Sequence, residues 1–167
     1  MARLKGVEKL DRMITEFVEQ FGCTAELDKE FCYWHEDELV NYTLVISKLV
    51  DTTWKEYVLK TFNYRIENIF MFSILHEIGH HFTMDDFPKR QLNFENRKVK
   101  KIEKALEKSD SDELDKKLNF EYFDMPMEKV ATKWAVNYYK KHRLEINNFW
   151  KKFNKELKNF YKVNGLK

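Results

Sequence analysis

The sequence predicts an α+β fold that is mostly helical, with a small antiparallel sheet packed on one buried helix. Gly (4 residues) and Pro (2 residues) are scarce in this 167-residue chain, which favours helices over tight turns. Apolar residues recur at three- and four-residue steps through most of the chain, as they do in helices that bury one face. Between residues 31 and 46 aromatic and β-branched residues dominate instead, which is typical of strands.

Composition places the chain among folded globular proteins. It is 43% hydrophobic and 35% charged, and its net charge of +2 argues against a nucleic-acid or membrane partner. Cys23 and Cys32 lack C-x-x-C spacing, so reduced thiols are expected, with a bridge between the two as the alternative. The first residues have no long apolar core, so no secretory leader is expected. We therefore expect one cytoplasmic domain over residues 1–167.

The N-terminal third contains the only predicted strands. Apolar residues from Leu4 to Phe21 share a helical face, and Gly22 is a natural stop for that helix. Residues 31–35 and 40–46 then form a predicted hairpin around an acidic turn, with a further short strand near residues 25–27. A second helix is expected to start at Asp51 or Thr52 as N-cap and to run through Phe62.

The next segment, from residue 64 to residue 83, predicts a helix that is apolar nearly all round and therefore buried. The apolar stretch is too short to span a membrane, and Pro88 follows its end. Gly79 lies inside this helix, where glycine costs about 1 kcal/mol relative to alanine. We expect Gly79 to repay that cost by letting a neighbouring backbone pack closely.

The same helix carries the motif H-E-x-x-H at residues 76–80. Positions i and i+4 share a helix face, so His76 and His80 can present two imidazoles to one metal ion. Imidazole suits Zn²⁺, and a catalytic zinc site usually takes three protein ligands and a water. Glu77 follows the first ligand, where its carboxylate can accept a proton from that water as the catalytic base.

Other candidate ligands near the motif have simpler interpretations. His81 points about 100° away from His80, which indicates a packing or supporting role. His35 lies in or beside the predicted hairpin turn and is expected to be an exposed loop residue. Asp85 and Asp86 offer alternative oxygen ligands, but a turn at the helix end explains them more simply.

Downstream of Pro88, residues 89–120 form a predicted charged helical insertion. Its first helix has a basic bias, which we interpret as a solvated face, with an acidic or nucleic-acid partner as the alternative. Residues 109–113 are expected to cap a second helix through Leu118. Asp124 is expected to cap a helix starting at Pro126, and a C-terminal helix covers residues 143–162.

A third metal ligand is expected on the helix that follows Pro126. Glu128 shares a helical face with Ala131 and Ala135, and small residues there let two ligand-bearing helices approach closely. His142 lies near the same face but about 21 Å further along the helix, so both cannot reach one ion. We choose Glu128, which gives the metal set His76, His80 and Glu128 with one Zn²⁺ per chain.

The chain resembles the ImmA/IrrE family of small zinc metallopeptidases, within the wider gluzincin group. The resemblance rests on the motif at residues 76–80 and on a helix of the form E-x-x-A-x-x-aromatic-A, here Glu128, Ala131, Trp134 and Ala135. It implies a zincin-like, minimal gluzincin fold, with His76, His80 and Glu128 as zinc ligands and Glu77 as general base. It also implies that strand 40–46 borders the cleft and pairs with an extended substrate.

Two features of the chain, one spacing and one residue, depart from the pattern of that family. The gap of 48 positions between His80 and Glu128 is long, and the charged insertion is expected to fill it. Members often carry Asn or Asp four residues after the glutamate ligand, where it can orient a ligand histidine, and Thr132 stands there in this chain. No separate helix-turn-helix segment is present in the sequence, so an attached DNA-binding domain is not implied.

The predicted function is a zinc metallopeptidase that hydrolyses peptide bonds. The resemblance suggests a specific regulatory protein substrate, such as a repressor of a phage or mobile element. The alternatives are a non-catalytic zinc-binding regulatory or interaction module of the same fold, and a nucleic-acid-associated factor that uses the basic helices. Candidates for stabilising the oxyanion are Tyr122, Tyr138, Tyr139 and His142.

Overall fold

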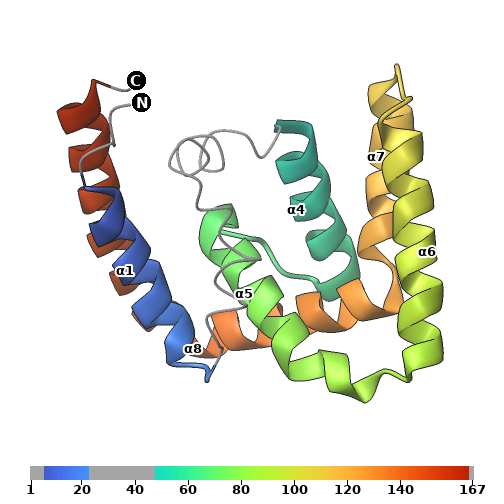
Figure 1. The fold of residues 1–167 in the computed structure, drawn as a ribbon, viewed down its shortest axis with the longest axis horizontal. Coiled ribbons are helices and arrows are strands. Elements are labelled where there is room, and N and C mark those ends of the chain that lie inside the picture. The colour runs from blue at the N-terminus through green and yellow to red at the C-terminus, as the bar shows by residue number, and fades with distance from the viewer. Residues whose placement is uncertain (1–5, 23–47, 166–167) are drawn as a thin grey trace. The chain divides into compact units, whose positions relative to one another are not determined.

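The computed structural model describes residues 6–22 and 48–165, and within them it consists of helices joined by short connections (Figure 1). The helices are α1 (Val7–Glu19), α4 (Lys48–Phe62), α5 (Ile69–Thr83), the 3₁₀ turn η1 (Met84–Asp86), α6 (Lys89–Leu106), α7 (Asp112–Phe123) and α8 (Pro126–Asn164). None of the helices in these residues is both long and apolar enough to cross a membrane.

The prediction of an α+β fold is wrong, because residues 6–22 and 48–165 contain no strand and have an all-α fold. The strands predicted at residues 25–27, 31–35 and 40–46 lie outside the described residues, as do His35 and both cysteines. The sheet was inferred from aromatic and β-branched composition, and β-propensity depends strongly on context. Helical periodicity, in contrast, is followed by a helix over most of the described residues, although residues 64–68, at the start of the helix predicted for residues 64–83, are not helical.

The chain divides into two compact units, Met1–Leu44 with Tyr139–Lys167, and Val45–Tyr138. Among the described residues the first unit contains α1 and the C-terminal part of α8. Within it the rings of Phe17 and Phe149 pack at a centroid distance of 4.5 Å, and Lys9 forms an ion pair with Glu156. α8 is interrupted at His142, whose backbone angles (φ −115°, ψ 24°) are not helical.

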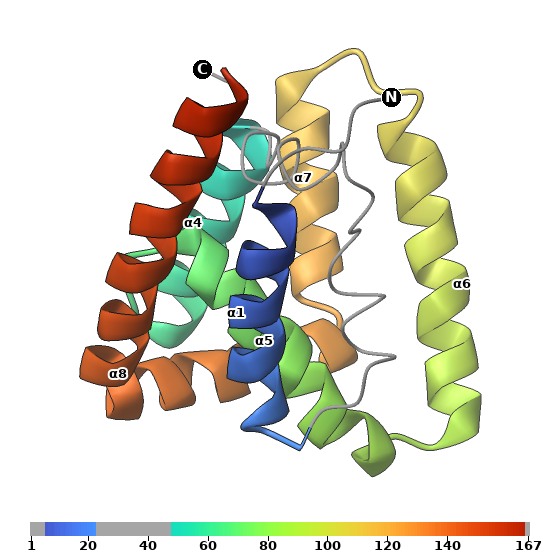
Figure 2. The ribbon, with the colours of Figure 1, turned by 60° about the vertical axis from the view of Figure 1, so that its left-hand side comes forward.

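The unit Val45–Tyr138 is built on an aromatic core between α4, α5 and α7. Trp54 of α4 stacks on Phe123 of α7 and meets Phe72 of α5 edge-on, at centroid distances of 5.6 and 5.4 Å. α6 and α7 run side by side in opposite directions, as both ribbon views show (Figures 1 and 2). These contacts hold α5, α6 and the start of α8 in place, and those three helices supply the candidate site.

The helix that carries the H-E-x-x-H motif is α5, and it begins later than its apolar pattern suggested. Asn68 caps it, because its side-chain oxygen accepts a hydrogen bond from the Met71 amide at 3.1 Å. The helix ends at Thr83 and Pro88 precedes α6, as expected. α4 begins at Lys48, so the predicted cap at Asp51 or Thr52 is wrong.

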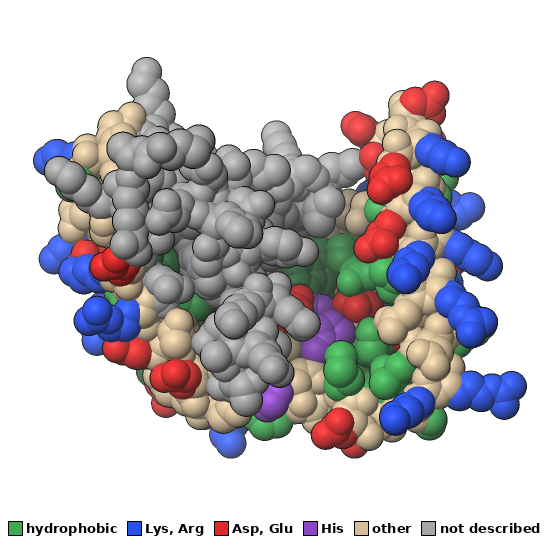
Figure 3. Space-filling model, viewed as in Figure 1, with side chains coloured by type: hydrophobic (Ala, Val, Ile, Leu, Met, Phe, Trp, Pro, Cys, Tyr) green, Lys and Arg blue, Asp and Glu red, His purple; other side chains and the backbone are tan. Residues whose placement is uncertain are grey.

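α6 and α7 confirm the helical, charged nature predicted for residues 89–120. Exposed Lys and Arg side chains follow the outer edge of α6 (Figure 3). They are Lys89, Arg90, Arg97, Lys100, Lys101 and Lys104. Glu95 and Ile102 are buried on the opposite face of the same helix. Ser111 caps α7 by accepting from the Leu114 amide, and the helix continues beyond Leu118 to Phe123.

Candidate metal centre

Two imidazoles face the same point from one side of α5. His76 and His80 are one helical turn apart, and their Nε2 atoms lie 3.1 Å from each other. The His76 residue is 5% exposed and the His80 side chain 12% exposed, so both rings are held largely away from water. α5 is apolar nearly all round and buried, which explains why the motif lies inside the unit.

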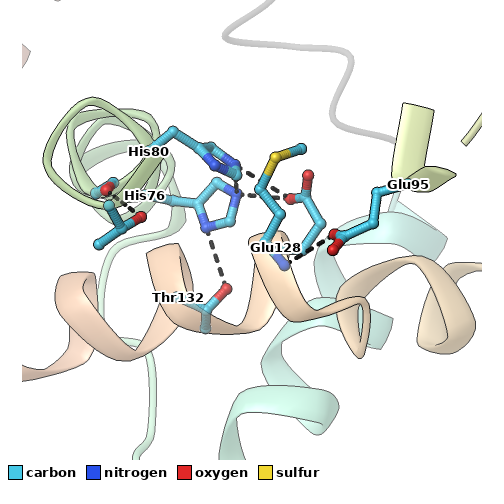
Figure 4. Close-up of polar contacts among 8 residues, drawn as sticks. His76, His80, Glu95, Glu128 and Thr132 are labelled. Carbon is cyan, nitrogen blue, oxygen red and sulfur yellow. Dashed lines mark hydrogen bonds and ion pairs between the residues drawn. The ribbon is translucent and has the colours of Figure 1, made fainter. Parts of the chain in front are cut away.

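Glu128, in the first turn of α8, reaches the same point from the opposite side (Figure 4). Its Oε2 atom lies 3.0 Å from His76 Nε2 and 3.3 Å from His80 Nε2. The residue is 3% exposed. The structure therefore brings together the three side chains that the sequence nominated as ligands, although 48 positions separate His80 from Glu128.

The separations of the three donor atoms lie within a few tenths of an ångström of what one metal ion requires. Tetrahedral zinc holds its nitrogen and oxygen ligands at about 2.0–2.2 Å, which places neighbouring ligand atoms about 3.3–3.6 Å apart. The observed separations are 3.0, 3.1 and 3.3 Å. In residues 6–22 and 48–165, His76, His80 and Glu128 form a group that could hold a metal ion.

The charges in this group are strongly coupled. Burial alone would raise the pKa of Glu128, but hydrogen bonds and attraction from His76 and His80 outweigh it and lower that pKa to about 2. Burial would lower the pKa of His80, but the hydrogen bond and charge of Glu128, followed by the charges of Glu77 and Glu95, raise it. The three carboxylates of Glu128, Glu77 and Glu95 thus favour a positive charge at His80.

Close contact between α5 and α8 makes this convergence possible. A Cβ atom added to Gly79 would lie 2.6 Å from the carbonyl oxygen of Ala131 and 3.1 Å from its Cα. Any side chain at position 79 would therefore push the two helices apart. The prediction that Gly79 packs against a neighbouring backbone is confirmed, and that backbone belongs to the helix of Glu128.

The orientation of the His76 ring is fixed by two further contacts. Thr132 Oγ1 lies 3.1 Å from His76 Nδ1, on the side of the ring away from Glu128 (Figure 4). Trp54 meets the ring edge-on at a centroid distance of 5.1 Å. With Nδ1–H donating to the threonine oxygen, the Nε2 lone pair points at the metal position. Thr132 therefore stands where it can orient a ligand histidine.

Glu77 and Tyr122 flank the ligand group without belonging to it. Glu77 is half-buried. Burial alone would lower the pKa of His80, and the negative charge of Glu77 adds to the larger effect of Glu128 in raising it. Burial raises the pKa of Tyr122, and the charge of Glu128 and a hydrogen bond to it raise it further. Tyr122 therefore keeps its proton at neutral pH.

The remaining nominated side chains have other partners. His81 is exposed and its ring meets that of Phe82 edge-on. Tyr138 stacks on Trp134, and the Tyr139 hydroxyl donates to Asn147 at 3.3 Å. His142, at the interruption of α8, bonds through Nδ1 to Glu145 at 3.0 Å. Asp85 and Asp86 are exposed in the turn η1, outside the ligand group.

One residue beside the site was missed in the sequence. Glu95 of α6 is 2% exposed and accepts a hydrogen bond from the backbone N–H of Met127 at 3.0 Å. It takes the capping position at the start of α8 that was predicted for Asp124, which instead ends α7 and pairs with Lys129. The available signal was an acidic residue at position 95 on the same helical face as Ile102.

Comparison of the chain with protein-family models, with curated proteins and with solved structures gave no match.

Proposed function

We propose that this protein is a zinc-dependent metallopeptidase of the gluzincin type, resembling the ImmA/IrrE peptidases. The observation that carries the proposal is the convergence of His76, His80 and Glu128 on one point, with Glu77 directly after the first ligand. Two imidazoles and one carboxylate are a donor set used by catalytic zinc, which keeps a further position open for water. When bound, zinc supplies Lewis-acid activation of that water and of the substrate carbonyl.

The chain's own residues then divide the remaining work. Glu77 is the general base: it accepts the proton of the attacking water and passes it to the leaving amine. Thr132 keeps the His76 ring in the tautomer that presents Nε2. Tyr122, whose pKa is raised by burial and by the charge of Glu128, stays protonated beside the ligand group and is the oxyanion candidate that the site favours. The family resemblance further suggests a narrow protein substrate, such as a repressor of a phage or mobile element.

Replacing Glu77 and Glu128 separately tests the proposal. Glu77→Gln keeps the side chain's size and removes its ability to take a proton, so zinc should stay bound. Hydrolysis of a library of unstructured peptides should fall by about 10²- to 10⁴-fold. Glu128→Ala removes a ligand and should lose both zinc and hydrolysis. Wild-type protein that holds zinc but cleaves no peptide or candidate repressor, with a biological effect that survives Glu77→Gln, would instead identify a non-catalytic zinc-binding module.

A further inference from the structure

Glu95 is a buried carboxylate that the proposed mechanism does not use. It lies on the inner face of α6 and is 2% exposed. Its Oε2 atom accepts from the Met127 amide and its Oε1 atom accepts from Gln91 Nε2, each at 3.0 Å. Figure 4 shows Glu95 beside Glu128, with its side chain directed toward the start of α8.

The hydrogen-bond partners of this carboxylate within residues 6–22 and 48–165 are an amide side chain and a backbone N–H, neither of which carries a formal charge, while its negative charge acts on His80 in the ligand group. An ionised group buried without an opposite charge is strongly unfavourable. The positive end of the α8 dipole offsets part of that cost, because Met127 carries the first free N–H of the helix after Pro126. A positive charge nearby would offset the rest of the free-energy cost of burying this carboxylate.

The metal position offers such a charge. The residue after Met127 is the ligand Glu128, so the hydrogen bond from Glu95 fixes the backbone that carries this ligand. A divalent ion held by two neutral histidines and one carboxylate would leave a net charge of +1 in a buried site. Glu95 cancels it, whereas the half-buried Glu77 is partly screened by water.

We propose that Glu95 is a positioning residue of the metal centre: its carboxylate holds the first turn of α8, and with it Glu128, and supplies the second negative charge for a divalent cation. This inference rests on the proposed zinc site. It makes α6, part of the charged insertion, a structural component of that site. Release of α6 from the start of α8 would weaken metal binding.

Zinc competition with a fluorescent chelator, run beside urea unfolding of the metal-free protein, tests this role. In Glu95→Gln the amide oxygen can still accept from Met127, but the negative charge is gone. Partners that support metal ligands typically contribute 10- to 100-fold in affinity, so the zinc Kd should rise by about tenfold or more. The urea midpoint should move little, since the loss of a charge-assisted bond is offset by relief from burying a charge.

Two further variants make the outcome decisive. Glu95→Ala removes the cap as well, so it should lower the urea midpoint and raise the zinc Kd by more than Glu95→Gln does. Glu107→Gln makes the same charge change at an exposed position just beyond α6 and should keep the Kd within about twofold of wild type. A Glu95→Gln protein that binds zinc as tightly as wild type would overturn the proposed role of Glu95 but would leave the zinc site itself in place. Wild-type protein that binds no zinc would overturn the zinc site, and the role of Glu95 with it.

Discussion

Gly79 of α5 and Ala131 of α8 lie in contact, and the space at the glycine is too small for a Cβ atom. A Cβ at position 79 would come within 2.6 Å of the Ala131 carbonyl oxygen. This contact sits one residue before His80 and three residues after Glu128, so it sets the distance between the helices that supply the ligands. The geometry of the metal centre therefore depends on a missing side chain.

We expect Gly79→Ala to destabilise the protein in spite of alanine's higher helix propensity. Propensity alone would favour the change by about 1 kcal/mol, but overpacking against a backbone costs about 1–3 kcal/mol or more. The free energy of unfolding from urea titration should fall, and the zinc Kd should rise. His81→Ala, an exposed substitution on the same helix, is the control and should stay within about 0.5 kcal/mol of wild type. A Gly79→Ala protein as stable as wild type would show that the helices separate freely.

Thr132→Val tests whether the threonine hydroxyl orients His76. The substitution keeps the shape of the side chain and leaves the buried Nδ1 of His76 without its partner. Loss of such a partner costs about 1–3 kcal/mol of stability, and zinc affinity should fall by about 10- to 100-fold. Thr132→Ser keeps the hydroxyl and should recover most of the affinity, which separates the hydrogen bond from side-chain volume. Equal zinc affinity in the Thr132→Val and Thr132→Ser proteins would show that the Thr132 hydroxyl does not support zinc binding.

The coupled pair of His80 and Glu128 makes the metal-free protein sensitive to pH. Burial would raise the pKa of Glu128, but hydrogen bonds from His76 and His80 outweigh it and lower that pKa from 4.5 to about 2. The ionised Glu128 therefore stabilises the folded protein above pH 4.5, and this stabilisation is lost as pH falls through 2. Burial would lower the pKa of His80, but Glu128 outweighs it and raises that pKa above 6.5. The protonated His80 therefore stabilises the folded protein below pH 6.5, and this stabilisation is lost as pH rises through the folded pKa.

The unfolding free energy of the metal-free protein should therefore be greatest between about pH 4.5 and 6.5 and decline at higher pH. Zinc should reverse this trend, because its ligands must be deprotonated and its binding strengthens as pH rises. Urea titrations across this range, with and without zinc, measure both slopes. His80→Gln should abolish the alkaline decline. Metal-free wild type that becomes steadily more stable above pH 6.5 would contradict the coupling.

The clustering of His76, His80 and Glu128 could be predicted from sequence because each part has a local signal. His76 and His80 are one turn apart, Glu128 stands beside two alanines, and Gly79 is an unfavourable residue in a buried helix. Local spacing fixes which side chains share a helix face, and small residues indicate where helices can approach. The start of α5 could also have been placed, since Asn68 precedes the apolar run as an N-cap would.

Contacts between distant segments were harder to anticipate. Glu95 bonds to Met127, 32 positions away, and nothing near either residue identifies the other. Asp124 was chosen as the cap because it lies just before Pro126, yet a tertiary contact takes that position. The α+β prediction rested on strands at residues 25–27, 31–35 and 40–46, which lie outside the described residues, whereas the described residues have an all-α fold.

Zinc stoichiometry by native mass spectrometry tests the central claim most directly. Wild-type and Glu77→Gln proteins, purified without chelator and supplied with zinc, should each carry one zinc per chain, because their three ligands are intact. Glu128→Ala should lose the ion under the same conditions. A wild-type protein that stays metal-free, or a Glu128→Ala protein that holds zinc as tightly as wild type, would contradict the assignment of His76, His80 and Glu128 as the metal centre.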